Sequence, residues 1–396
     1  MTTNIPNTAL DSAAEASIPA STQETAVGDP NQHETLHSSK SKPSERFQSI
    51  QILRAIAAIA VVLFHVREYL KIIGGVEQSI FSIFTEVFAN GATLFFCISG
   101  FLMAHLITTG YRHFLPRRLL RIYPTFFIAV ALALALRTLA FGTIPQPDLL
   151  AALSLLPLGR IAYPLNIEWT LVYEVFFYLI CTIFTFHATR KLFPIFLGGW
   201  LIAIIAMWMM TDTPQLALPT IETIFFQAYN IYFIAGGLTY YVTRLTPPLP
   251  KAACFVVTLV IAGSIATWPL LKTNSLFSKY ETFIFAIYAT AILLVALSIK
   301  TGAPDRAMQI MIKLGDYSYG IYLIHVPVIV TIFYYYTLHV GALSSKVALF
   351  ALVASIVCGC YLGKLDVRLH RWVSSKIFRP SHRPDLAVAR ARGRIW

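Results

Sequence analysis

Residues 50–70 of this chain read IQILRAIAAIAVVLFHVREYL, an apolar run long enough to cross a lipid bilayer as one helix. Two ionisable side chains, Arg54 and His65, lie inside that run. Such a group is energetically expensive in a membrane helix, so it usually faces the protein interior or a water-filled cavity. The spacing of eleven residues puts the two groups on one helix face, roughly 16 Å apart. A cation near the membrane edge, in line with an imidazole deeper in the helix, suggests an elongated binding site for a long anionic ligand.

Both residues also have a purely structural explanation. Arg54 could extend to anionic lipid head groups, and His65 could be a buried histidine that is hydrogen-bonded to a neighbouring helix. The helix alone does not separate these explanations from a functional one, so the rest of the chain has to decide.

The composition of the chain is that of a polytopic membrane protein. Of its 396 residues, 57% are hydrophobic and 13% are charged, whereas a soluble domain carries about 25% charged residues. The net charge of +12 is therefore attributed to topology and to contact with lipid or an anionic ligand, and not to nucleic acid. We expect no metal site, because Cys358 and Cys360 have a poor spacing for zinc and no histidine pair accompanies them.

The apolar runs predict an all-α integral membrane protein with about ten transmembrane helices. The predicted spans are 50–70, 83–108, 119–141, 167–187, 193–210, 220–242, 252–271, 279–299, 314–337 and 344–372. Residues 1–45 are polar and lack hydrophobic periodicity, so we expect a disordered cytoplasmic tail there. The transmembrane domain then spans 46–375, and 376–396 form a basic cytoplasmic tail.

Lysine and arginine are concentrated in every second connection between these spans. The connections rich in lysine and arginine contain Arg112, Arg117, Arg190, Lys191 and Arg244, among others. The alternate connections contain few such residues, among them Arg67, Lys71 and Lys346. Positively charged connections stay in the cytoplasm. Both termini are then predicted to be cytoplasmic, as an even number of spans requires, and the protein is expected in the inner (cytoplasmic) membrane as a multi-pass protein.

A cluster of arginines precedes the third span, in the sequence YRHFLPRRLLRIYP at 111–124. Arg118 and Arg121 are three residues apart and share a helical face. Together with Arg117 they form a cationic cluster on the side of the membrane where Arg54 lies. Positive-inside topology explains part of this cluster, but Arg121 lies inside the helix, and guanidinium groups suit phosphate. We therefore predict a phosphate site.

Deeper polar residues are the second candidate group. Glu174 lies in NIEWTLVYEVFFYLI (166–180), and a buried carboxylate there needs a partner or a proton. Its estimated depth is similar to that of His65, so a His65–Glu174 pair is expected. Tyr322 and His325 place polar groups in LGDYSYGIYLIHVPV (314–328), where Asp316 is expected to cap the helix start.

Residues 91–106 read GATLFFCISGFLMAHL. Gly100 in this apolar helix is expected to allow close helix packing. Ser99 could contribute to the same packing, or its hydroxyl could hydrogen-bond a ligand.

In these motifs the chain resembles the membrane-bound acyltransferase family 3, and within it the exopolysaccharide O-acetyltransferase branch. The matching motifs are QSIQILRAIAAIAVVLFH with Arg54 and His65, LFFCISGFLM, the pair Arg118 and Arg121 before IYP, WTLVYEVFFYL with Glu174, and LGDYSYGIYLIHVPV with His325. The resemblance covers roughly residues 46–372, with the five motifs in the family's order.

The resemblance implies about ten membrane helices, acetyl-CoA as the acyl donor and sugar hydroxyls of exported or lipid-linked polysaccharides as acceptors. Arginines resembling Arg54 and Arg121 are associated with the CoA end, and a histidine resembling His65 with catalysis. The catalytic residues are thus expected to be His65 and Glu174, either with His65 as a general base or with a covalent acyl-histidine. Arg54, Arg117, Arg118 and Arg121 are expected to hold the donor, and Ser99, Tyr322 and His325 the substrate.

Two positions depart from the family pattern. The family often has an acidic residue before the FF of the second span, where this chain has Thr93. A Glu–x–Pro signature is common near the end, where this chain reads Asp366-Val367-Arg368. The alternative function from another class is a transporter or flippase without chemistry, because an intramembrane histidine and glutamate also suit proton coupling.

Overall fold

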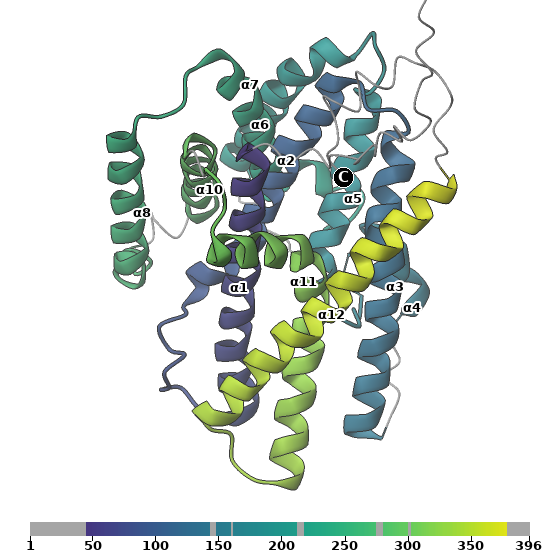
Figure 1. The fold of residues 1–396 in the computed structure, drawn as a ribbon, viewed down its shortest axis with the longest axis vertical. Coiled ribbons are helices and arrows are strands. Elements are labelled where there is room, and N and C mark those ends of the chain that lie inside the picture. The colour runs from purple at the N-terminus through teal and green to yellow at the C-terminus, as the bar shows by residue number, and fades with distance from the viewer. Residues whose placement is uncertain are drawn as a thin grey trace, which may run out of the picture. The chain divides into compact units, whose positions relative to one another are not determined.

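The computed structural model describes residues 45–142, 148–159, 161–211, 218–274, 280–299 and 302–377. The predicted N-terminal tail and most of the basic C-terminal tail lie outside these residues. The described part is all helical (Figure 1) apart from turns and one isolated bridge. Its α-helices are α1 (Glu45–Gly74), α2 (Gly91–Thr109), α3 (Phe114–Phe141), α4 (Leu149–Ser154), α5 (Glu168–Ile183), α6 (Phe193–Met210), α7 (Asn230–Leu245), α8 (Lys251–Leu271), α10 (Glu281–Ser298), α11 (Arg306–His339) and α12 (Ser345–Ile377).

Eight helices in the described part are long and apolar enough to cross a membrane, which makes this a multi-pass membrane protein. All ten predicted spans overlap a helix. Two of these helices, α5 and α7, are not among the eight that are long enough to cross a membrane, because they have only 16 residues each. In the third span the helix begins at Phe114, earlier than predicted.

Three of the predicted spans begin at residues other than those at which the helices begin in the structure, for local reasons. A short 3-10 helix, η1 (Glu86–Asn90), precedes α2. The stretch from 220 holds turns and the 3-10 helix η3 (Ile224–Phe226), so α7 begins only at Asn230. Asp316 was expected to cap a helix, but α11 already begins at Arg306, where Asp305 caps it by accepting from the Met308 N–H at 2.7 Å.

The most buried of the candidate spans are α1, α2 and α11, and α8 is the least buried. α11 packs along both α1 and α12, and α2 packs along α7. The α2–α7 contact is backbone on backbone, because a Cβ on Gly100 would collide with the Phe233 carbonyl and one on Gly236 with the Cys97 carbonyl. Small residues allow such close approach in membrane helices, so the prediction made for Gly100 is confirmed.

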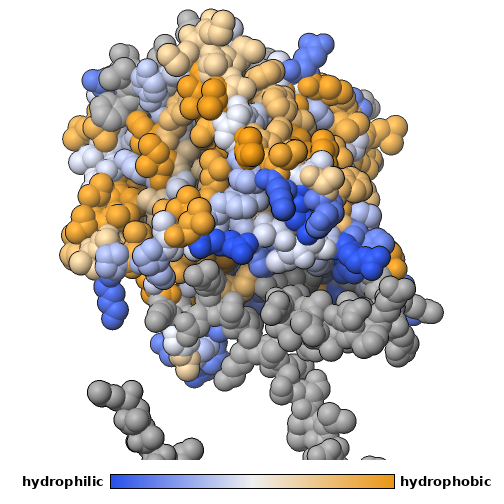
Figure 2. All heavy atoms as spheres, turned by 90° about the horizontal axis from the view of Figure 1, so that it is seen from above, coloured by the Kyte–Doolittle hydropathy of each residue, from blue (hydrophilic) through white to orange (hydrophobic). Residues whose placement is uncertain are grey.

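Figure 2 looks down on the end of the molecule at which α1 begins. Hydrophilic side chains gather there among largely hydrophobic sides. The arginines of the α2–α3 connection and the first turns of α3 belong to this end, because α2 and α1 run in opposite directions in the fold. This end thus carries a cluster of arginines, two of which, Arg118 and Arg121, line the cavity described next.

Candidate active site

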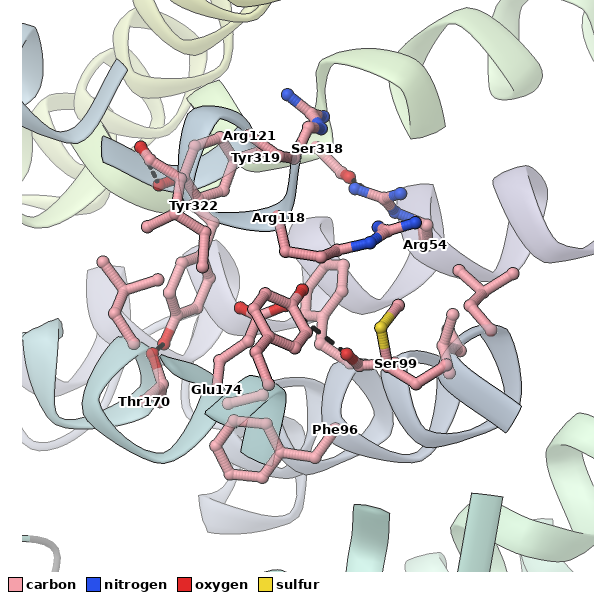
Figure 3. Close-up of a pocket in the computed structure, with 18 residues that line it drawn as sticks. Arg54, Phe96, Ser99, Arg118, Arg121, Thr170, Glu174, Ser318, Tyr319 and Tyr322 are labelled. Atoms are coloured by element: carbon pink, nitrogen blue, oxygen red, sulfur yellow. Dashed lines mark hydrogen bonds between the residues drawn. The ribbon is translucent and has the colours of Figure 1, made fainter. Parts of the chain in front are cut away.

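A cavity of about 800 Å³, counting the open space at its mouth, lies between α1, α2, α3, α5 and α11. Figure 3 shows arginines along one wall of the cavity, with Ser99 and Glu174 across from them. Six of the nine predicted site residues line it. They are Arg54, Ser99, Arg118, Arg121, Glu174 and Tyr322.

The cationic wall is built by α1 and α3. Arg54 donates from Nε to the Ser318 hydroxyl of α11 at 3.2 Å. The buried Nε of Arg118 has no hydrogen-bond partner among the described residues. A buried polar group without a partner is unusual in a folded protein and costs stability. The Arg118 guanidinium is therefore suited to an anionic ligand that enters the cavity.

Arg121 also lines the cavity but is already paired. Its guanidinium forms an ion pair with Asp366 of α12 and lies 5.5 Å from the Tyr319 ring centre. Asp366 is 1% exposed and accepts a second hydrogen bond, at 2.7 Å, from the Thr125 hydroxyl. Asp366, the residue at the departure from the family's Glu–x–Pro signature, thus ties α12 to α3 beside the cavity.

Arg117, the remaining predicted donor-binding arginine, is not among the residues that line the cavity. It donates to the Tyr111 hydroxyl at 3.4 Å, and its guanidinium lies 5.3 Å from the centre of the Tyr111 ring. The structure therefore places Arg117 with the α2–α3 connection and separates it from Arg118, its neighbour in sequence.

Glu174 has partners other than the expected one. Its Oε1 accepts from the Tyr178 hydroxyl at 2.5 Å, and the Ser99 hydroxyl lies 3.5 Å away. The predicted His65–Glu174 pair was wrong. Equal depth in a membrane does not fix which side of a helix a residue faces, and Glu174 faces the arginine cavity.

His65 instead meets His325. His65 Nδ1 lies 3.2 Å from His325 Nε2 and 2.9 Å from the Val61 carbonyl. His325 Nδ1 lies 2.7 Å from the Tyr322 carbonyl, which can only accept. A neutral His325 therefore carries its proton on Nδ1 and offers the Nε2 lone pair to the Nδ1–H of His65. This assignment leaves His65 Nε2 with a free lone pair, the atom that a general base needs.

Tyr322 connects the cavity to this histidine pair. Its ring lies 5.7 Å from the His325 ring and 5.8 Å from the Phe95 ring, measured between centres. Its hydroxyl lies 2.9 Å from the Thr170 hydroxyl. Tyr322 and Phe95 line the cavity, whereas His65 and His325 do not. The Tyr322 ring thus contacts His325 and also lines the cationic cavity.

Residues 47–364 match a family defined by an acyltransferase domain, acyltransferase 3. This chain belongs to the acyltransferase 3 family. The matched region contains every predicted site residue, and comparisons with curated proteins and with solved structures gave no significant match. Membership in this family indicates acyl transfer from an acyl donor.

Sequence reasoning missed several residues of this candidate site. Tyr178 could have been found, because it lies one helical turn from Glu174. Asp366 and Ser318 come from segments 245 and 264 residues away from their arginine partners, and no local pattern signals such contacts. Among the described residues, no group of three or more His, Cys, Asp and Glu side chains could hold a metal ion.

Proposed function

We propose that this acyltransferase 3 protein is an O-acetyltransferase of the inner (cytoplasmic) membrane. It moves acetyl from acetyl-CoA to a sugar hydroxyl of an exported or lipid-linked polysaccharide. The observation that carries the proposal is the order of groups along α1 and α11. Arg54 meets Ser318 on the cavity side, and His65 meets His325 further along the same two helices.

The donor's phosphates rest on Arg118 and Arg54. Arg118 offers an unpartnered buried donor, and guanidinium groups bind phosphate through several parallel hydrogen bonds. Arg121 supports this wall from its ion pair with Asp366. The spacing of Arg54 and His65 on α1, roughly 16 Å, is of the order of an extended pantetheine arm. The thioester can then reach the histidine pair while the nucleotide end stays in the cavity.

His65 acts as the general base. Its Nε2 takes the proton of the acceptor hydroxyl while that oxygen attacks the thioester carbonyl carbon. The carbon–sulfur bond then breaks, CoA leaves as the thiolate, and the imidazolium returns its proton to the sulfur. The Val61 carbonyl and His325 Nε2, 2.9 and 3.2 Å from His65 Nδ1, together hold the required tautomer and orientation of His65. Glu174, Tyr178 and Ser99 form the polar floor of the donor cavity.

The test is acetyl transfer by the purified protein. Labelled acetyl-CoA should be consumed, and the label should appear on the polysaccharide of the native strain. A deletion strain should lose those acetyl groups, as mass analysis of its surface polysaccharide would show. Binding or movement of substrate without any loss of acetyl from acetyl-CoA would favour the transporter or flippase instead.

A further inference from the structure

The polar floor of the donor cavity, formed by Ser99, Glu174 and Tyr178, brings an acidic group into a cationic site. Ser99 and Glu174 lie across the cavity from Arg54 and Arg118 (Figure 3). Within the described part of the chain, Glu174 forms no ion pair with an arginine. A carboxylate repels phosphate. The phosphates of the donor therefore rest on the arginines, and the polar floor is left for another part of the ligand.

The hydrogen bonds of the polar floor leave one acceptor and one donor available. Tyr178 donates to Glu174 Oε1 at 2.5 Å, whereas Glu174 Oε2 accepts no hydrogen bond from the residues that the structure describes. The Ser99 hydroxyl lies 3.5 Å from Oε1, which is longer than the about 2.5–3.0 Å of an ordinary hydroxyl hydrogen bond. The Ser99 proton is therefore available to a closer acceptor. An acceptor beside a donor matches a secondary amide, which offers one N–H and one C=O.

The polar floor also lies along the way from the arginines to the histidine pair. The Tyr322 side chain, whose ring contacts the histidine pair, contacts Phe95 of α2 and Thr170 of α5. Ser99 and Glu174 each follow one of these contacts by four residues on the same helix, which is roughly 6 Å or one helical turn. That turn leads towards the end of the molecule at which α1 begins. A ligand that extends from the arginines to the histidines therefore passes Ser99 and Glu174.

We propose that Ser99 and Glu174 bind an amide of the pantetheine arm of CoA and so make the cavity selective for CoA thioesters. This inference rests on the proposed function, which supplies CoA as the donor. Both amides of CoA lie in the pantetheine arm, between the phosphates and the sulfur. Glu174 Oε2 accepts from the amide N–H, a strong hydrogen bond because the acceptor is ionised, and the Ser99 hydroxyl donates to the amide carbonyl. Glu174 thus binds the donor and takes no proton in the reaction.

The experiment measures the dissociation constants of CoA and of adenosine 3′,5′-bisphosphate with the purified full-length protein. The bisphosphate resembles the nucleotide end of CoA and lacks the pantetheine arm, so the ratio of the two constants isolates that arm. Glu174→Gln keeps an oxygen that can accept from Tyr178 but presents no carboxylate to the amide. It should weaken CoA binding by roughly 10–100-fold, as expected for loss of a hydrogen bond to a charged group. Binding of the bisphosphate should not weaken.

Three further variants control the comparison. Arg118→Gln should weaken both ligands by the same factor and leave the ratio of the constants as it is in wild type. Glu86→Gln also removes a carboxylate, but Glu86 pairs with Lys272 and does not line the cavity, so neither constant should change. Ser99→Ala should weaken CoA alone, by roughly 2–10-fold, because it removes a hydrogen bond between neutral groups. Ser99→Ala also keeps the test decisive if Glu174→Gln does not fold.

Two results would overturn the assignment. Equal loss of both ligands in Glu174→Gln would mean that Glu174 supports the cavity as a whole. An unchanged ratio of the constants in Glu174→Gln and Ser99→Ala would mean that the polar floor does not contact the pantetheine arm. Failure of the proposed function is distinguishable from both, because wild-type protein would then neither bind CoA nor hydrolyse acetyl-CoA, whatever the variants show.

Discussion

His65 on α1 and His325 on α11 face each other, with His65 Nδ1 3.2 Å from His325 Nε2. Seven residues before His325 on α11, Ser318 accepts from Arg54, which precedes His65 by eleven residues on α1. The two helices therefore run in the same direction and share one seam. Arg54, which is proposed to bind the phosphates of the donor, and His65, the proposed general base, both lie along that seam.

His325 is expected to act through His65. In His325→Gln the amide oxygen can still accept from the Nδ1–H of His65, so acetyl transfer should fall less than in His65→Gln. His325→Leu removes one of the two acceptors and leaves only the Val61 carbonyl, 2.9 Å from His65 Nδ1, so its rate should fall below that of His325→Gln but stay above that of His65→Gln. Rates are measured with purified protein at saturating acetyl-CoA. Equal activity of His325→Leu and wild type would show that His325 does not position His65.

Two adjacent arginines give a matched test of the donor site. Arg118 lines the cavity, whereas Arg117 contacts Tyr111 outside it. Arg118→Gln should raise the dissociation constant for CoA by roughly 10–100-fold, and Arg117→Gln should change it little. The comparison controls for net charge and for position in the sequence. If both variants bound CoA equally well, the phosphates would have to lie elsewhere.

Breaking the Arg121–Asp366 pair is expected to destabilise the fold. The two side chains are 15% and 2% exposed, and removing one partner of a buried pair costs about 3–5 kcal/mol. Asp366→Ala should therefore lower the thermal unfolding midpoint in detergent. The double variant Arg121→Met with Asp366→Leu should recover much of that loss, since it leaves no unpaired charge. A midpoint that stays at the wild-type value in Asp366→Ala would contradict the ion pair.

Close packing of α2 and α7 predicts a second effect on stability. Gly100→Ala places a methyl group against the Phe233 backbone carbonyl, and overpacking of this kind costs about 1–3 kcal/mol. Gly263→Ala in α8 is the control, because no atom lies within 4 Å of the added Cβ. The thermal midpoint should fall for Gly100→Ala alone. Equal midpoints for both variants would mean that α2 and α7 are further apart.

The predictable part of this protein follows from local sequence. Apolar runs located every long helix, and the eleven-residue spacing on α1 correctly put Arg54 and His65 on one face, since both contact α11. Contacts between distant segments were not predictable. Neither the Arg121–Asp366 pair nor the His65–His325 pair follows from spacing, because each depends on how helices rotate against one another. The orientation of Glu174 was wrong for the same reason.

The most direct test of the central claim is acetyl transfer by His65→Gln. Glutamine keeps polarity and similar reach but cannot take a proton, and loss of a general base typically costs a factor of about 10²–10⁴ in rate. His105→Gln is the control, because His105 packs against Phe47 and Tyr240 away from the cavity. We expect His65→Gln to bind CoA and accumulate in the membrane as wild type does, while its transfer rate falls by that factor. Near-normal acetylation by well-expressed His65→Gln would contradict both a general base and an acyl-histidine at this position.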